Sequence, residues 1–300
     1  MAGMDDYLPI AEHGLIGDLH SVALVGTDGT IDWYCCPRFD SPSVFCAILD
    51  KAKGGYWRVS PLHSDWKSKQ LYFPDTNVLI TRFLTQDGVG EVQDFMPVGE
   101  HVDGAHRQRI VRRVVSVRGH MRFHMHMEPR FNYARDDHEV NLHEHGAIFR
   151  SRDITMGMES TVPLKVVAGN AVSAGFSLDE NESATFLLER VPNDFVPRHH
   201  HHDETRSMFD GTVAYWRKWL SQSRYRGRWR EMVNRSLHTL EREGIIRLTG
   251  QNSRKSNRHV RIQTPCNKKK TTKGKKSSKK HKSHGKKKHK SAAAKQSAKN

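Results

Sequence analysis

Apolar and polar residues alternate with period two from residue 15 to about residue 195, and turn residues interrupt the alternation at short intervals. Such alternation places the apolar side chains of a strand on one face of a sheet. Many strands with regular turns and no intervening helices favour an antiparallel sandwich. About 180 residues suffice for two large stacked sheets around one core. The sequence therefore predicts a mainly β fold, an antiparallel two-sheet β-sandwich.

Turn dipeptides set the expected strand pairing. Asp28-Gly29 and Asp87-Gly88 each lie between two apolar runs. Because both central residues of such a turn adopt positive φ readily, each dipeptide predicts a β-hairpin. A third hairpin is expected at Arg118-Gly119, joining residues 110–117 to 121–127.

The second strand of that third hairpin carries a stripe of large apolar residues. Its polar residues alternate with them, so the two sets point to opposite faces. A stripe at this spacing is typical of a protein core, whereas two histidines two residues apart are typical of a solvated row. The stripe consists of Met121, Phe123, Met125 and Met127, and the opposite face carries Arg122, His124 and His126.

Beyond Pro197 the period changes to that of a helix. Two apolar stripes with helical spacing predict two amphipathic helices that need a partner surface. Packing is also the expected role of their tryptophans, with stacking on a sugar as the alternative. The first stripe is Phe209, Val213, Trp216 and Leu220, and the second is Trp229, Met232, Val233, Leu237 and Leu240.

The net charge of +16 belongs to the C-terminal part of the chain. Residues 247–300 contain 20 Lys or Arg and no acidic residue, whereas residues 1–246 carry 29 basic and 33 acidic residues. Residues 267–300, with 15 lysines and no aromatic side chain, are expected to be disordered. Such a tail would bind nucleic acid or another polyanion without sequence preference. A non-adapted extension, such as an altered reading frame produces, is the alternative.

The chain has four cysteines, Cys35, Cys36, Cys46 and Cys266, and no CxxC pair. This spacing favours reduced, buried thiols over a disulfide framework or a zinc site. The N-terminus is acidic where a signal peptide would be basic, and no apolar run approaches a membrane span. We therefore expect a cytoplasmic protein without a membrane span.

Several segments together resemble the N-terminal region of bacterial family-15 glycoside hydrolases, the glucoamylase and α,α-trehalase group. The resemblance covers roughly residues 5–240. The segments are Leu15–Phe45, Thr76-Asn77-Val78-Leu79, Asp94-Phe95-Met96-Pro97, Pro129-Arg130-Phe131-Asn132-Tyr133-Ala134-Arg135 and Arg226–Ser236.

The resemblance implies an N-terminal β-supersandwich, then linker helices, then an (α/α)₆ barrel that holds both catalytic glutamates. Inverting glycosidases need two carboxyl groups on opposite sides of the scissile bond. After Ser236 the chain no longer follows the family, and its last acidic residue is Glu243. We therefore expect a domain truncated before the barrel, inactive alone, with no catalytic residue, metal or cofactor.

The expected domains are a β-sandwich at 1–195, linker helices at 196–250 that begin an uncompleted barrel, and a disordered Lys-rich tail at 251–300. The best candidate site is the loop Pro37–Pro42, where Arg38, Phe39 and Asp40 combine a cation, an aromatic face and a carboxylate. In the family such a loop would border the sugar site or the barrel. A purely structural role is favoured, in which an Arg38–Asp40 ion pair anchors the loop and Phe39 is buried.

Ordinary structural roles account for the other clusters of titratable residues. His199–His202 could bind a transition metal, but a polar linker is favoured because consecutive loop residues rarely present a fixed coordination geometry. His143 and His145 are expected in a solvated row. The carboxylate pairs Asp136-Asp137, Glu12 with Asp18, and Asp179 with Glu182 are typical of surface turns.

Three functional hypotheses follow. The chain is an inactive N-terminal domain of a trehalase- or glucoamylase-like enzyme, or an interaction protein tethered to nucleic acid by its tail. In the third hypothesis the domain complements a separately encoded helical-barrel partner through the helices at 207–244.

Overall fold

The computed structural model describes residues 7–63, 65–98, 108–223, 225, 227–229 and 232–234, together with the backbone of 246–247 and 261–262. Met1–Thr264 forms one compact unit. The second unit, Pro265–Asn300, lies outside the described residues and includes the Lys-rich segment and Cys266.

The first sheet contains eight antiparallel strands in the order β1-β2-β3-β5-β10-β15-β14, with β4 paired to β3. A single 3₁₀ turn, η1 (Ile10–Glu12), precedes it. The strands are β1 (His13–Gly17), β2 (Val22–Gly26), β3 (Thr30–Cys35), β4 (Ser43–Phe45), β5 (Tyr56–Pro61), β10 (Met121–Glu128), β14 (Lys165–Val167) and β15 (Ala171–Leu178).

The second sheet also contains eight antiparallel strands, in the order β11-β12-β13-β16-β9-β8-β7-β6. They are β6 (Lys67–Tyr72), β7 (Leu79–Leu84), β8 (Gly88–Phe95), β9 (Arg109–Gly119), β11 (His138–His143), β12 (Gly146–Ser151), β13 (Thr155–Ser160) and β16 (Ser183–Arg190). Outside the two sheets, β17 (Ile246–Arg247) pairs with β18 (Arg261–Ile262).

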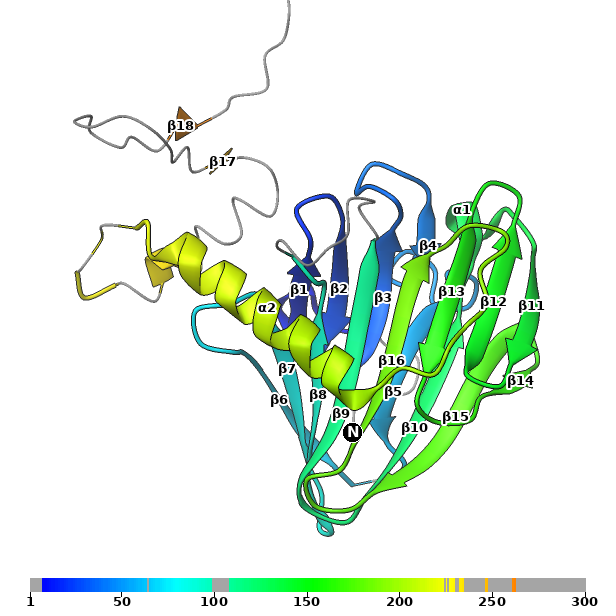
Figure 1. The fold of residues 1–300 in the computed structure, drawn as a ribbon, viewed down its shortest axis with the longest axis horizontal. Coiled ribbons are helices and arrows are strands. Elements are labelled where there is room, and N and C mark those ends of the chain that lie inside the picture. The colour runs from blue at the N-terminus through cyan, green and yellow to red at the C-terminus, as the bar shows by residue number, and fades with distance from the viewer. Residues whose placement is uncertain are drawn as a thin grey trace, which may run out of the picture. The chain divides into compact units, whose positions relative to one another are not determined.

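One hydrophobic cluster fills the space between the two sheets, which confirms the predicted sandwich (Figure 1). Its members come from strands of both sheets, and the stripe Met121, Phe123, Met125 and Met127 is buried there as predicted. The hairpins across Asp28-Gly29 and Asp87-Gly88 are also confirmed, since β2 pairs with β3 and β7 pairs with β8.

The hairpin predicted at Arg118-Gly119 is wrong. β9 pairs with β8 and β16, whereas β10, the next strand along the chain, pairs with β5 and β15 in the other sheet. Gly119 has a φ of 74°, and an added Cβ would overlap the carbonyl oxygen of Asp87. Each strand buries one face in the shared core, so the chain crosses from one sheet to the other instead of pairing with itself.

A buried ion pair links the sheets. Arg112 on β9 and Asp94 on β8 are both fully buried, with Nε 2.8 Å from Oδ1. Arg112 also donates to two backbone carbonyls of the first sheet, those of Trp57 at 2.6 Å and Gly29 at 2.7 Å. Burial raises the pKa of Asp94, and Arg112 opposes that shift.

The helix α2 (His202–Leu220) crosses the outer face of the second sheet over β16, β9, β8 and β7 (Figure 1). Its predicted apolar stripe is confirmed. Val213 is buried in a second cluster whose members are Val78, Phe95, Val111 and Leu187, with Phe73, Met208 and Phe209 packed against it. Trp216 and Trp219 are buried, so packing is their role, whereas Trp229 is exposed. Of the second predicted helix, Trp229 lies in a turn, residues 232–234 are helical, and Leu237 and Leu240 lie outside the described residues.

Candidate functional site

The predicted loop connects β3 to β4 at one end of the sandwich. Arg38 and Asp40 form an exposed bidentate pair, with Nε–Oδ1 at 2.9 Å and Nη2–Oδ2 at 3.3 Å. The hydrogen bond from Arg38 lowers the pKa of Asp40. The loop backbone is held by the bond from the Phe39 N–H to the carbonyl of His20, at 3.1 Å. The Cys36-Pro37 peptide is cis.

The Arg38–Asp40 ion pair expected for a structural role is present, but Phe39 is not buried as that role predicts. Phe39 is 53 % exposed. An exposed aromatic ring beside a fixed ion pair is available for contact with a ligand or with another protein surface. The structure therefore leaves Arg38, Phe39 and Asp40 as candidates without assigning them a role.

A second Pro-Arg-Phe segment lies beside the first. Residues 129–132 read Pro-Arg-Phe-Asn and residues 37–40 read Pro-Arg-Phe-Asp. The backbone N–H of Arg130 donates to the carbonyl of Val44 at 2.8 Å, and that of Tyr133 donates to Ser43 Oγ at 3.0 Å. In this second segment the phenylalanine, Phe131, is buried.

The segment α1 (Phe131–Ala134) is a left-handed turn. Three consecutive residues other than glycine have positive φ, namely Asn132 at 54°, Tyr133 at 60° and Ala134 at 59°. Left-handed backbone costs about 1–2 kcal/mol for each such residue. Strain of this kind persists only where surrounding contacts impose it, and it is common at binding sites.

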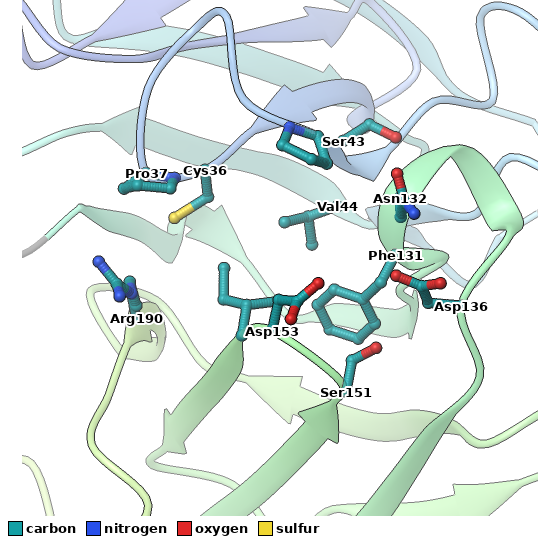
Figure 2. Close-up of a pocket in the computed structure, with 12 residues that line it drawn as sticks. Cys36, Pro37, Ser43, Val44, Phe131, Asn132, Asp136, Ser151, Asp153 and Arg190 are labelled. Carbon is teal, nitrogen blue, oxygen red and sulfur yellow. The ribbon is translucent and has the colours of Figure 1, made fainter. Parts of the chain in front are cut away.

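The two Pro-Arg-Phe segments border a pocket of about 170 Å³ between the sheet ends (Figure 2). Residues from both sheets contribute to it, from the β3–β4 loop, from α1, from the β12–β13 turn and from the end of β16. The lining consists of Cys36, Pro37, Pro42, Ser43, Val44, Phe131, Asn132, Asp136, Ser151, Asp153, Ile154 and Arg190.

Three cysteines lie in or near this end of the sandwich. Cys35, Cys36 and Cys46 are buried free thiols, as predicted. Burial raises the pKa of Cys36 to about 12 and that of Cys35 to about 11. Because the thiolate is the nucleophilic form, these thiols are unreactive at neutral pH. Cys36 therefore serves as a packing residue of the pocket wall.

The histidine run before α2 does more than link the sandwich to the helix. His200 is buried, with Nδ1 3.1 Å from Glu204 Oε2 and 3.4 Å from Glu159 Oε2. Burial alone would raise the pKa of Glu159, but the His200 ring and the Arg198 backbone N–H outweigh it, so the pKa is lowered. This cluster anchors the first turn of α2 to β13. Within the described ranges, no group of three or more His, Cys, Asp or Glu could hold a metal ion.

The predicted histidine row on β10 is half-buried rather than fully solvated. His124 Nε2 lies 2.9 Å from Ser173 Oγ on β15, and burial lowers the pKa of His124. His126 packs its ring against Tyr56 at 5.2 Å. Both side chains lie on the face of the first sheet that points away from the core.

Sequence reasoning missed the polar residues of the pocket. The sequence predicts a surface turn at Asp136 and assigns no site role to Asn132, Asp153 or Arg190. The repeated Pro-Arg-Phe tripeptide is the available signal, because it marks the two segments that lie side by side. The helix α2 is not long and apolar enough to cross a membrane, nor is any other helix in the described part of the chain.

The fold and the pocket define a two-sheet β-sandwich domain with a small polar site at its loop end. Residues 2–172 match the family described as "Trehalase-like, N-terminal", so the chain belongs to that family. The resemblance noted from sequence segments is thereby confirmed.

Curated relatives are trehalases. The trehalase of Thermoplasma volcanium is 32% identical over 241 residues, which cover 79% of this chain and 38% of the relative. The Mycobacterium tuberculosis trehalase is 28% identical over 255 residues, covering 78% of this chain and 37% of the relative. Trehalase 1 of Sulfolobus acidocaldarius is 42% identical over 87 residues, covering 29% of this chain and 15% of the relative. The chain thus spans less than two fifths of the length of these relatives.

Proposed function

We propose that this chain is the non-catalytic N-terminal domain of a trehalase-like glycoside hydrolase, whose intact form hydrolyses an α-glucoside. The observation that carries the proposal is the match to trehalases over most of this chain but less than two fifths of theirs. Hydrolysis with inversion needs an acid and a base that bracket the scissile bond. We place both carboxyl groups in the part of the relatives that this chain does not match.

The loop tip would then contact the catalytic part. Phe39 is exposed at the loop end, and the Arg38–Asp40 pair beside it is already formed. A preformed pair loses little side-chain entropy when it docks, and an exposed aromatic ring is a common anchor of protein interfaces. The expected partner is a helical barrel that carries the catalytic carboxylates.

Activity measurements test the catalytic part of this proposal. The purified chain should release no glucose from trehalose or maltose. Glucose release that a single Asp or Glu substitution abolishes would refute the non-catalytic assignment.

Complementation tests the docking part. The region of the Thermoplasma volcanium trehalase that this chain does not match should gain trehalose hydrolysis when it is co-expressed with this chain. Phe39→Ala should lower the recovered activity about thirtyfold, because an interface anchor contributes about 2 kcal/mol. Leu142→Ala is the matched control, since Leu142 is an exposed apolar residue on β11. Equal losses in both variants would exclude the loop tip as the contact.

The charge of residues 247–300 favours a second candidate function, the binding of nucleic acid or another polyanion. This segment carries 20 Lys or Arg and no acidic residue. Binding would release counterions and fall steeply with salt. Deletion of residues 267–300 should abolish retention of DNA, and binding that persists at high salt would contradict the idea.

A cytoplasmic location, which the free thiols of Cys35, Cys36 and Cys46 support, completes the proposal.

A further inference from the structure

The pocket at the loop end carries polar side chains whose hydrogen-bonding capacity is not used within the described part of the chain. The side chains of Asp136, Asp153, Asn132 and Arg190 line it, and none makes a hydrogen bond or ion pair with another described residue. Asp136 and Asn132 are half-buried, whereas Asp153 and Arg190 are exposed. Their convergence on one cavity therefore indicates a ligand site.

The polar groups gather at one end of the pocket. The carboxylates of Asp153 and Asp136 and the amide of Asn132 face the same space, with the ring of Phe131 between the two carboxylates (Figure 2). The guanidinium of Arg190 lies at the opposite end, near Cys36 and Pro37 (Figure 2). A ligand would meet acceptors at one end, a cation at the other, and apolar carbon between them.

This arrangement fits a molecule with many hydroxyl groups. Ionised carboxylates only accept hydrogen bonds, whereas a guanidinium only donates them. A hydroxyl group can serve both, because it donates one hydrogen bond and accepts two. The C–H faces of a sugar ring can pack on the apolar residues Phe131, Val44 and Ile154, which also line the pocket.

The volume limits the ligand to a single ring. Pockets for drug-sized ligands have volumes of about 300–1,000 Å³, and this one has about 170 Å³. We propose that the pocket between the two Pro-Arg-Phe segments binds one hexopyranose ring, through Asp136, Asp153, Asn132 and Arg190.

Ionic ligands fit the pocket less well. Two carboxylates against one guanidinium repel a phosphate. Arg190 at the other end disfavours a metal cation, and the described residues supply no group of three metal ligands. A neutral polyol is repelled neither by the two carboxylates nor by Arg190, so its binding should be insensitive to ionic strength.

The site belongs to the sandwich alone and goes beyond the function proposed above. Binding by the isolated chain needs no catalytic partner. If the chain did not bind sugar, the proposed docking to a catalytic partner could still be correct. If complementation failed, the proposed sugar site could still be correct.

Titration of the full chain with D-glucose and trehalose tests the inference by calorimetry. We expect D-glucose to bind with a dissociation constant on the order of 1–10 mM, typical of a small polar ligand. Trehalose should bind no tighter, because the pocket admits one ring. Raising the salt concentration should leave both constants unchanged.

Substitutions assign the binding to this pocket. Asp153→Asn and Asp136→Asn should each weaken D-glucose binding about tenfold, because each replaces a charged acceptor with a neutral one. Asp137→Asn is the matched control, since Asp137 is an exposed neighbour of Asp136 that does not line the pocket. Its affinity should equal that of the unmodified chain. The proposal is overturned if D-glucose does not bind at about 100 mM, if binding falls steeply with salt, or if all three variants bind alike.

Discussion

At the scale of single residues, Arg112 joins the two sheets through buried hydrogen bonds. Its guanidinium reaches Asp94 on its own sheet and two carbonyls of the opposite sheet. It also lies 5.1 Å from the centre of the Trp57 ring. A buried cation is tolerated where hydrogen bonds satisfy its donors, and here the partners come from β8, from β5 and from the turn before β3.

Replacing Arg112 should be costly. Arg112→Met leaves the buried carboxylate of Asp94 without a cation and two carbonyls without donors, so the free energy of unfolding should fall by about 3–5 kcal/mol. The double variant with Asp94→Leu should regain part of this loss, since it removes the lone charge. Urea unfolding followed by circular dichroism measures both.

Arg113→Met is the control for that experiment. Arg113 is half-buried and donates one hydrogen bond of 3.3 Å to Gln93. Its loss should cost about 1 kcal/mol. If the two arginine variants lost equal stability, the inter-sheet role of Arg112 would be wrong.

The left-handed turn beside the pocket allows a test of opposite sign. Ala134 has a φ of 59°, where glycine adopts the conformation without strain. We expect Ala134→Gly to raise the free energy of unfolding by about 0.5–1 kcal/mol, the relief of strain less the entropy of a more flexible unfolded chain. Ala214→Gly, at an exposed position inside α2, should lower it by about 1 kcal/mol. Thermal unfolding shows whether each variant is more or less stable than the parent. If Ala134→Gly lost stability as Ala214→Gly does, the backbone at Ala134 would not be strained.

At the scale of elements, the contact between α2 and the second sheet should depend on pH. Glu159 on β13 contacts the His200 ring and accepts a hydrogen bond from the Arg198 backbone N–H. Glu204 on α2 contacts the same His200 ring and accepts from the Arg198 guanidinium. The folded protein holds the pKa of Glu159 below its ordinary value of 4.5. Its contribution is therefore complete above pH 4.5 and is lost as the pH falls through the lowered pKa.

Glu159→Gln should remove that contribution. At pH 7 the variant should unfold about 1–2 kcal/mol more easily than the parent. The difference should shrink below pH 4.5, because the parent then loses the same charge. Glu139→Gln, at an exposed position of β11, serves as the control and should match the parent at every pH. A difference between Glu159→Gln and the parent that does not change with pH would show that the carboxylate charge is irrelevant.

The strands were easier to predict from sequence than their partners. Asp28-Gly29 and Asp87-Gly88 are local signals, and both hairpins formed there. Arg118-Gly119 looks similar in sequence, but the chain crosses between sheets at that point. The difference lies in which sheet each strand joins when it buries its apolar face, and the residues of the turn do not encode that choice. The edge strand Lys67–Tyr72 was missed because its exposed residues lack an apolar face.

The site shows the same limit. The β3–β4 loop was predicted from its composition, but the exposure of Phe39 depends on surroundings that lie elsewhere in the chain. Asn132 and Asp136 come from the β10–β11 connection, Asp153 from the β12–β13 turn and Arg190 from the end of β16. Asp153 and Arg190 are 37 positions apart and line the same pocket only because β13 pairs with β16.

At the scale of the whole molecule, α2 packs directly on the sandwich. Val213 is buried in a cluster with residues of the second sheet, Trp216 is fully buried, and Phe209 contacts the rings of Phe73 and Phe95. The predicted domain end at residue 195 lies before these contacts. We therefore propose that the smallest stable unit extends through α2 to residue 223.

Two truncations test this boundary. A fragment of residues 1–223 should unfold at the same urea concentration as the full chain. A fragment of residues 1–195 should lose roughly 5 kcal/mol or more, since each large apolar side chain contributes about 1.5–3 kcal/mol when buried. A typical domain has only about 5–15 kcal/mol in total, so the shorter fragment should be marginal and bind a hydrophobic dye.

Point variants separate the loss of the helix contacts from the loss of chain length. Trp216→Ala in the full chain should cost about 3–5 kcal/mol, because it opens a cavity beneath α2. Trp229→Ala should cost less than about 0.5 kcal/mol, since that ring is 56 % exposed. If the two tryptophan variants were equally stable and residues 1–195 unfolded like residues 1–223, α2 would contribute nothing to the fold. The domain would then end where the alternating pattern ends, and the helix would be available to pack on another protein.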